Sequence, residues 1–308
     1  MKDSTAVEQN SEADASGLEG VCERVLVAAP RSIGGGVFVR RYLPAVARQM
    51  VGPFIFFDMI GPAALPPVGE MKVRPHPHIN LATVTYLLAG EIIHRDSLGS
   101  YQAIRPGDIN WMTAGRGIVH SERSPSGRTE TTDLHGIQLW VALPAEHEEV
   151  EPEFDHYPRA SLPVIEADGV TIRVLAGAAY GATSPVKTLS PLIYADIVLA
   201  GGASHRVTEE HRERALFLPE GPLEIEGERV EAPCLVILEP GAAVTIRAPQ
   251  ATRALLIGGE PLAGERHLWW NFVSTRPERI EAAKAEWREG RFPKVPGDEV
   301  EFIPLPEG

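Results

Sequence analysis

The chain has few cysteines, no run of basic residues and no long uninterrupted apolar segment. Its two cysteines, Cys22 and Cys234, form no CxxC pair, which fits a reducing compartment and makes neither a convincing nucleophile or metal ligand. Lys and Arg number 29 against 42 Asp and Glu. The formal net charge of −13 argues against nonspecific binding to nucleic acid or to anionic membranes.

No stretch of the sequence has the character of a membrane span or a secretory signal. The most apolar early segment, residues 51–69, contains Asp58 and four prolines, which excludes a span. Residues 1–21 are acidic and poor in large apolar side chains, so we expect a flexible tail without a signal-type apolar region. These features together predict a cytoplasmic protein.

Turn-forming residues are abundant, with 29 Gly and 27 Pro. Between them lie short runs rich in Val, Ile, Leu and aromatics, such as "TVTYLLAG" (83–90), "IQLWVAL" (137–143) and "LIYADIVL" (192–199). Short strands separated by regular turns are typical of a sandwich or barrel. A length of 308 residues suggests roughly two domains. We expect an all-β protein with two similar domains, joined by the Pro- and acid-rich stretch 143–163.

One helix is expected near the C-terminus, in "TRPERIEAAKAEWREGRF" (275–292). Thr275 and Glu278 have the spacing of a capping box. Ile280, Ala283 and Trp287 form an apolar stripe, and Gly290 is a plausible C-cap. The interpretation is a helix that packs on a β domain.

Two pairs of polar residues have the spacing of metal ligands. His76 and His78 are two residues apart, and so are His120 and Glu122. Residues i and i+2 of a strand share a face, so each pair can project to the same side. Three imidazoles and one carboxylate suit Fe, Mn, Cu, Ni or Zn, and four ligands leave two octahedral positions free for catalysis. Outside these four residues, the sequence offers His205 and His211 without a clear partner pair, so one metal per chain is expected.

The stretches "HPHINLATVTYLLAGEIIHRDSLGS" and "IRPGDINWMTAGRGIVHSE" resemble the signature of the pirin family of bicupins. The resemblance is most specific over residues 53–143 and continues to a tail, "RHLWWNFVSTRPERIEAAKAEWREGRFPKVPGDEVEFIPLPE", similar to those of bacterial pirins. It implies two cupin (double-stranded β-helix or jelly-roll) barrels with a short C-terminal helix. The implied division is a metal-binding cupin domain over residues 22–150, after the tail 1–21, and a cupin domain without metal over residues 151–308.

The resemblance also implies the ligand set His76, His78, His120 and Glu122 and one transition metal, usually Fe(II), with Zn, Mn, Ni or Cu as alternatives. Many cupins have a glutamate four residues after the second histidine, where this chain has Ala82. We therefore expect Glu122 to supply the only carboxylate.

Two functions follow from the resemblance. The first is an oxidoreductase of the quercetin 2,3-dioxygenase type (a quercetinase), with a small aromatic substrate and O2, and with Glu122 as the catalytic base. Five apolar residues are candidates for the substrate pocket: Phe54, Phe56, Phe57, Trp111 and Met112. The alternative is a non-catalytic, metal-dependent regulator that binds a transcription factor or a metabolic enzyme.

Overall fold

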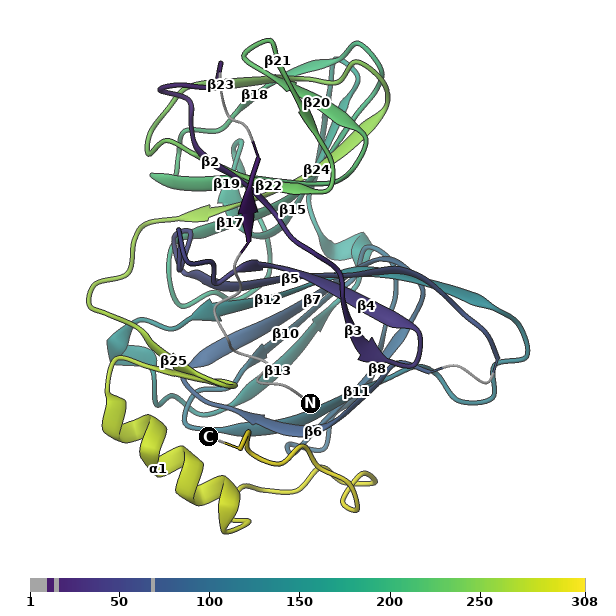
Figure 1. The fold of residues 1–308 in the computed structure, drawn as a ribbon, viewed down its shortest axis with the longest axis vertical. Coiled ribbons are helices and arrows are strands. Elements are labelled where there is room, and N and C mark those ends of the chain that lie inside the picture. Colours follow the sequence, from purple (N-terminus) through teal and green to yellow (C-terminus); the bar gives the residue numbers. More distant parts are fainter. Residues whose placement is uncertain (1–9, 14–16, 68–69, 308) are drawn as a thin grey trace.

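The computed structural model describes residues 10–13, 17–67 and 70–307, and its regular structure is almost entirely β-strand. The strands build two barrels that lie one above the other in Figure 1, with the helix α1 beside the lower barrel. The expectation of an all-β protein with two barrels and one C-terminal helix is confirmed for the described residues.

The lower barrel contains most of the first half of the chain. Its larger sheet has seven strands, in the order β13 (Glu153–Tyr157), β10 (Ile109–Thr113), β7 (Leu81–Ala89), β12 (Thr132–Ala142), β5 (Phe54–Leu65), β4 (Val37–Leu43) and β3 (Arg31–Gly34). Its smaller sheet has the order β6 (Lys72–His78), β11 (Ile118–Arg123), β8 (Ile92–Asp96) and β9 (Tyr101–Ile104). Neighbouring strands are antiparallel, so alternate side chains of each strand point into the barrel.

The upper barrel repeats this plan. Its larger sheet has the order β1 (Ser11–Glu12), β2 (Cys22–Val27), β22 (Cys234–Leu238), β19 (Glu213–Glu220), β24 (Thr252–Gly259), β17 (Leu192–Leu199), β15 (Val170–Ala179) and β14 (Val164–Ala167), with β16 (Ala182–Thr183) paired to β15. Its smaller sheet has the order β18 (Ser204–Val207), β23 (Val244–Arg247), β20 (Pro222–Ile225) and β21 (Glu228–Glu231). Two short 3-10 turns, Ala145–His147 and Arg159–Ser161, lie in the connection between the barrels.

The two larger sheets pack against each other through a shared apolar core. Side chains from both barrels take part, including Tyr42, Phe57 and Val84 from the first and Tyr194 and Phe217 from the second. Because one face of each sheet is buried in this core, the opposite face of the seven-stranded sheet lines the interior of the first barrel. That interior is where the candidate site lies.

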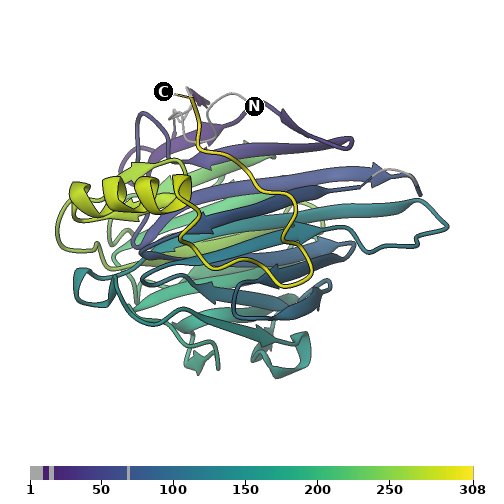
Figure 2. The same ribbon diagram turned by 90° about the horizontal axis from the view of Figure 1, so that it is seen from below.

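Each end of the chain packs on the barrel that the other half of the sequence mainly builds. Near the N-terminus, β2 pairs with β22 of the second barrel, and Leu18 is 3% exposed in that barrel's core. Near the C-terminus, β25 (His267–Trp269), β26 (Phe272–Ser274), α1 (Pro277–Arg288) and the tail lie outside the smaller sheet of the first barrel (Figure 2). The division of the chain into two domains near residue 150 remains a proposal. The contacts add that the N-terminal strand β2 belongs to the second barrel and that the C-terminal segment packs on the first.

The predicted flexible tail, residues 1–21, falls partly outside the described residues. Residues 1–9 and 14–16 are not described. Ser11 and Glu12 form β1 on β2, and Leu18 is buried, so the described part of this segment is held by the second barrel. The sequence suggested otherwise because a few apolar residues in an acidic stretch are only a weak signal of packing.

The helix begins and ends close to its predicted limits, but its N-terminus is not capped as predicted. Arg276 is the N-cap residue, with no side-chain cap, and Pro277 occupies the first turn. Instead of capping the helix, Thr275 donates its hydroxyl and its backbone N–H to the carboxylate of Glu148, at 3.0 and 2.7 Å. Gly290 follows the helix with φ of +67°, as expected of a residue that ends a helix.

Candidate metal centre

Three histidines meet inside the first barrel. One ring nitrogen each of His76, His78 and His120 can be chosen so that the three lie within 4.8 Å of one another. The ring centroids are 4.3 to 5.0 Å apart, and all three side chains are buried. Within the described residues this is the one such group of His, Cys, Asp and Glu donors.

The sequence places these histidines through ordinary strand geometry. His76 and His78 share a face of β6, and His120 lies opposite His76 in the neighbouring strand β11. Pro75 and Pro77 lack N–H groups, and β6 is accordingly an edge strand of its sheet. The backbone N–H of Ile303 donates to the carbonyl of Pro75, so the C-terminal tail covers this edge.

The turn that leads into β11 requires glycine. Gly115 has φ of +48°, and a Cβ there would lie 2.0 Å from the carbonyl oxygen of Val150. The "TAGRG" stretch therefore closes a tight turn five residues before His120.

Hydrogen bonds orient two of the three rings. Nδ1 of His76 donates to the carbonyl of Arg74 at 2.9 Å, and Nδ1 of His78 donates to the carbonyl of Asn271 at 3.1 Å. A carbonyl can only accept, so each ring carries its proton on Nδ1 and presents an unprotonated Nε2. Both ring nitrogens of His120 are buried without a hydrogen-bond partner. A buried polar atom without a partner is costly, and a metal ion would satisfy it.

The site keeps its imidazoles neutral. Burial lowers the pKa of His76 to about 4. Burial, and then the neighbouring imidazoles, place the pKa values of His78 and His120 well below the usual range. Neutral imidazole is the form that binds metal, so these residues fit a metal ion without further rearrangement of charge.

Glu122 lies beside this group but outside it. The register between β11 and β6 shifts between His120 and Glu122, and no Glu122 oxygen belongs to the set of donor atoms within 4.8 Å of one another. The side chain is buried, close to the Thr85 hydroxyl of β7. Burial raises the pKa of Glu122 to about 7, and the polar Thr85 hydroxyl nearby offsets part of that rise. A carboxyl with such a pKa can both accept and return a proton near neutral pH.

A polar row crosses the sheet that faces the histidines. Its members occupy directly paired positions on successive strands: His156, Asn110, Thr85, Gln138, Asp58 and Arg41. Thr85 donates to the Gln138 side chain at 2.9 Å, and Arg41 binds both Asp58 oxygens at 2.8 Å. Apolar clusters lie on the two sides of this row, one around Leu87 and one around Trp140. The interior therefore has a polar middle, with the candidate site in it.

The five predicted pocket residues separate into two groups. Phe56 and Met112 belong to the apolar cluster inside the first barrel, and the Phe56 ring stacks on Trp140 at 4.0 Å. Trp140 in turn meets the His78 ring edge-on, with centroids 5.0 Å apart. Phe54, Phe57 and Trp111 instead fill the core between the barrels, so their assignment to a pocket beside the histidines does not match the structure. Alternation along the strands turns Phe57 away from Phe56 and Trp111 away from Met112. The register shift at Trp140 and Val141 then places Phe54 on the same face as Phe57.

The same alternation changes the meaning of Ala82. Its side chain is fully buried in the core between the barrels, with Val84 and Tyr86. A glutamate here would point away from the three histidines. The candidate site therefore does not lose a ligand because position 82 is an alanine.

Sequence reasoning missed His94 and Trp140. His94 donates from Nε2 to Asp96 at 2.9 Å, stacks on Phe154 and lies 5.4 Å from the His120 ring between centroids. His94 and Asp96 are also an i, i+2 pair, so a search for His-x-Asp would have found them. Trp140 carries no comparable signal, because an aromatic residue in a strand is most often core.

The histidines of the second barrel have other contacts. Nε2 of His211 donates to the carbonyl of Ala178 at 2.9 Å, and the His205 ring lies 5.1 Å from the Tyr180 ring.

Family models match both halves of the chain. Residues 36–141 match the model described as Pirin, and residues 194–293 match the Pirin C-terminal cupin domain. A pirin-like protein of Caulobacter vibrioides is 46% identical over 276 residues, which cover 89% of this chain and 96% of that protein. The chain belongs to the pirin family.

Solved structures agree with this assignment and with the bicupin fold. A crystal structure of a quercetin 2,3-dioxygenase from Acinetobacter baumannii is 35% identical, with a TM-score of 0.85, covering 92% of this chain and 95% of that one. A bacterial pirin from Escherichia coli in complex with nickel(II), at 19% identity and a TM-score of 0.61, shares the fold.

None of the helices in the described part of this pirin has both the length and the apolar character needed to cross a membrane.

Proposed function

We propose that this pirin is an iron(II)-dependent dioxygenase that acts on flavonols such as quercetin. The observation that carries the proposal is the group of three buried, neutral histidines, with the unpartnered ring nitrogens of His120 among them. The quercetin 2,3-dioxygenase of Acinetobacter baumannii is similar over nearly the whole chain, which supports this choice of substrate class.

In this proposal His76, His78 and His120 hold the metal through nitrogen, and Glu122 is the fourth ligand or a base next to it. When bound, a redox-active metal supplies the chemistry with dioxygen that no side chain here can perform. The Arg74 and Asn271 carbonyls fix the rings of His76 and His78, and so fix the direction of their Nε2 atoms.

Glu122 has the properties of a base for the flavonol hydroxyl. Its pKa of about 7 lets it take a phenolic proton at neutral pH and release it later. The Thr85 hydroxyl lies close to this carboxyl and donates its proton to Gln138. Phe56, Met112 and Trp140 provide an apolar surface inside the barrel against which aromatic rings can pack.

The test starts from protein purified without oxygen and reconstituted separately with Fe(II), Mn(II), Ni(II), Cu(II) and Zn(II). We expect oxygen uptake and carbon monoxide release with quercetin, greatest with iron. The Glu122→Gln variant should retain metal more weakly and turn over about 10²-fold more slowly, because the amide is a poor proton acceptor. Full iron occupancy without oxygen uptake from any flavonol would contradict the proposal. Equal turnover in Glu122→Gln would exclude Glu122 as the base.

A further inference from the structure

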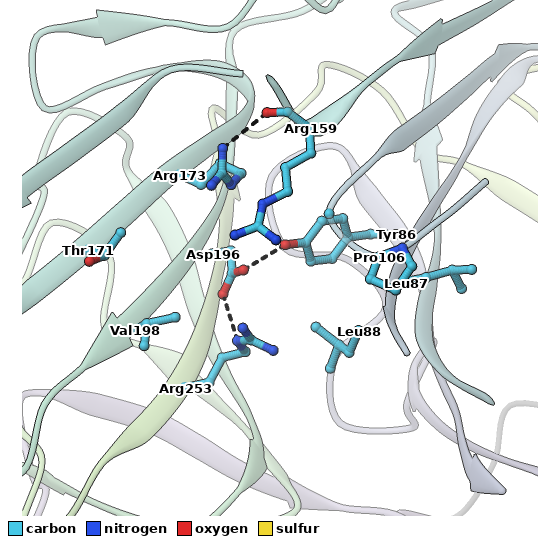
Figure 3. Close-up of a pocket in the computed structure, with 11 residues that line it drawn as sticks. Tyr86, Leu87, Leu88, Pro106, Arg159, Thr171, Arg173, Asp196, Val198 and Arg253 are labelled. Carbon is cyan, nitrogen blue, oxygen red and sulfur yellow. Dashed lines mark hydrogen bonds and ion pairs between the residues drawn. The ribbon is translucent and has the colours of Figure 1, made fainter. Parts of the chain in front are cut away.

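A polar cavity lies between the two barrels, away from the histidines. It has a volume of about 120 Å³ and opens between β7 and the turn at Gly107 on one side and β15, β17 and β24 on the other (Figure 3). Tyr86 of β7 lines it, whereas the neighbouring Thr85 points to the metal centre on the opposite face of the same strand.

The charges around this cavity are unbalanced. Three guanidinium groups, of Arg159, Arg173 and Arg253, line it together with one carboxylate, that of Asp196. Three positive charges and one negative charge leave an excess of two positive charges. The connection between the barrels contributes one of these arginines, and two strands of the second barrel contribute the others.

Asp196 is occupied by its own partners. The Tyr86 hydroxyl donates to Oδ2 of Asp196 at 2.6 Å, and Nε of Arg253 lies 3.2 Å from Oδ1 (Figure 3). Burial, and then the charge of Asp196, raise the pKa of Tyr86, so the phenol keeps the proton that it donates. The carboxylate therefore offsets Arg253 and leaves the charges of the other two arginines uncompensated.

Arg159 and Arg173 have no carboxylate partner within ion-pair distance among the described residues. Arg173 donates one N–H to the carbonyl of Arg159 at 3.1 Å, which uses one of the five donors of its guanidinium. The aliphatic part of Arg159 passes over Gly107, where a Cβ would lie 2.6 Å from its Cδ. In Figure 3 this side chain extends toward the Tyr86–Asp196 pair.

Asp108, the acid next to the turn at Gly107, forms no ion pair with Arg159 or Arg173 in the described part of the chain. Asp108 follows Gly107, but its two oxygens accept the backbone N–H groups of Arg159 and Arg105, at 2.8 and 3.2 Å. It is not among the residues that line the cavity.

We propose that this cavity binds a compact oxyanion with two negative charges, of the kind represented by inorganic phosphate or a small dicarboxylate. Guanidinium groups bind such oxygens in pairs, and charge-assisted hydrogen bonds are the stronger kind. The excess of two positive charges matches a dianion. The volume is well below the roughly 300–1,000 Å³ of pockets for drug-sized ligands, so a flavonol does not fit here. The positive charge disfavours a metal cation.

The test measures binding of inorganic phosphate, and separately of succinate, to the full-length protein by calorimetry at constant ionic strength. We expect saturable binding of at least one anion, at one site per chain. Arg173→Gln and Arg159→Gln should each weaken it by about tenfold or more, since each removes hydrogen bonds to a charged group. Arg229→Gln is the matched control, because Arg229 is an exposed arginine of the second barrel paired with Glu231, and it should bind like the wild type.

The comparison of phosphate with succinate identifies the chemical class of the natural ligand. Preference for phosphate indicates a phosphate or phosphate-ester ligand, and preference for succinate indicates a dicarboxylate. Phosphate that bound at the histidines instead would be insensitive to Arg159→Gln and Arg173→Gln, and that result would overturn the proposal. Absence of saturable binding by both anions would also overturn it. Arg159 is exposed, so its variant should fold, and circular dichroism checks this.

Discussion

The carbonyl of Asn271 accepts a hydrogen bond from Nδ1 of His78 at 3.1 Å, although 193 positions separate the two residues in the chain. The segment that supplies this carbonyl follows the second barrel in sequence and lies against the first. Ile79 and Phe272 form a parallel bridge beside it, and Phe272 is fully buried. The end of the chain therefore helps to orient a candidate metal ligand near its beginning.

Replacing Phe272 by Ala should weaken both folding and metal binding. The cavity should cost about 3–5 kcal/mol of stability. The loosened segment should also release the His78 ring, and loss of such a support typically costs about 10–100-fold in metal affinity. The measurements are chemical denaturation and competition with a chelator, at a temperature where the variant is folded.

Leu256→Ala is the control for that experiment. Leu256 is fully buried in the core of the second barrel, so its loss should destabilise the protein by about 2–5 kcal/mol while metal affinity stays unchanged. Equal metal affinity in both variants would show that the C-terminal segment does not position His78.

His120→Ala should remove most of the metal affinity, because it deletes one of the three imidazoles, whose nitrogens have no other partner. His211→Ala, which removes a buried histidine from the second barrel, should keep close to one metal ion per chain. Elemental analysis after reconstitution and desalting measures both. Two ions per chain in the wild type, or full metal in His120→Ala, would contradict the assignment of the site.

Metal affinity should rise with pH up to about pH 7 and then level off. Below that pH the Glu122 carboxyl, whose pKa is about 7, is protonated and must lose its proton to bind a cation. The histidines add little to this slope above pH 5, because the pKa of His76 is about 4 and those of His78 and His120 lie well below the usual range. The expected slope is about one logarithmic unit of affinity per pH unit.

The Glu122→Gln variant should show almost no pH dependence over the same range, in the same chelator competition. A wild-type slope well above one logarithmic unit per pH unit below pH 6.5, or a fall of similar size in Glu122→Gln, would mean that the imidazoles titrate as in water. That outcome would contradict the buried, neutral state described here.

The two buried cysteines should make the fold sensitive to alkali. Burial raises the pKa of Cys22 to about 11 and that of Cys234 to about 12, from 9.0. In the unfolded chain both thiols ionise near pH 9, whereas the folded chain keeps them protonated. Between pH 9 and about 11 the unfolded state therefore binds fewer protons, and rising pH favours unfolding.

At pH 10 the loss of stability from both thiols should be about 3 kcal/mol relative to pH 8. Urea unfolding of the wild type and of the Cys22→Ala/Cys234→Ala variant measures it, because other groups titrate equally in both proteins. A thiol reagent should also react with the native wild type only slowly at pH 8. Rapid reaction, or an equal loss of stability in the variant, would refute this account.

Local rules in the sequence were sufficient for much of this protein. The period-2 spacing of His76 with His78 predicted that both lie on one face of a strand, and the structure places them so. Turn residues between short apolar runs predicted the all-β fold, and the quoted stretches identified the family. The helix was located, although Thr275 does not cap it, because Glu148 from the connection between the barrels binds Thr275 instead.

Tertiary structure decided what local periodicity cannot express. Phe54, Phe56 and Phe57 look equivalent in sequence, yet a bulge and the second barrel determine which of them faces the site. The same packing turns Ala82 away from the histidines, brings Asn271 to His78, and collects Arg159, Arg173 and Arg253 around one cavity. A strand's alternation fixes which residues share a face, but which face meets which partner depends on how whole sheets pack, and that is a property of the assembled chain.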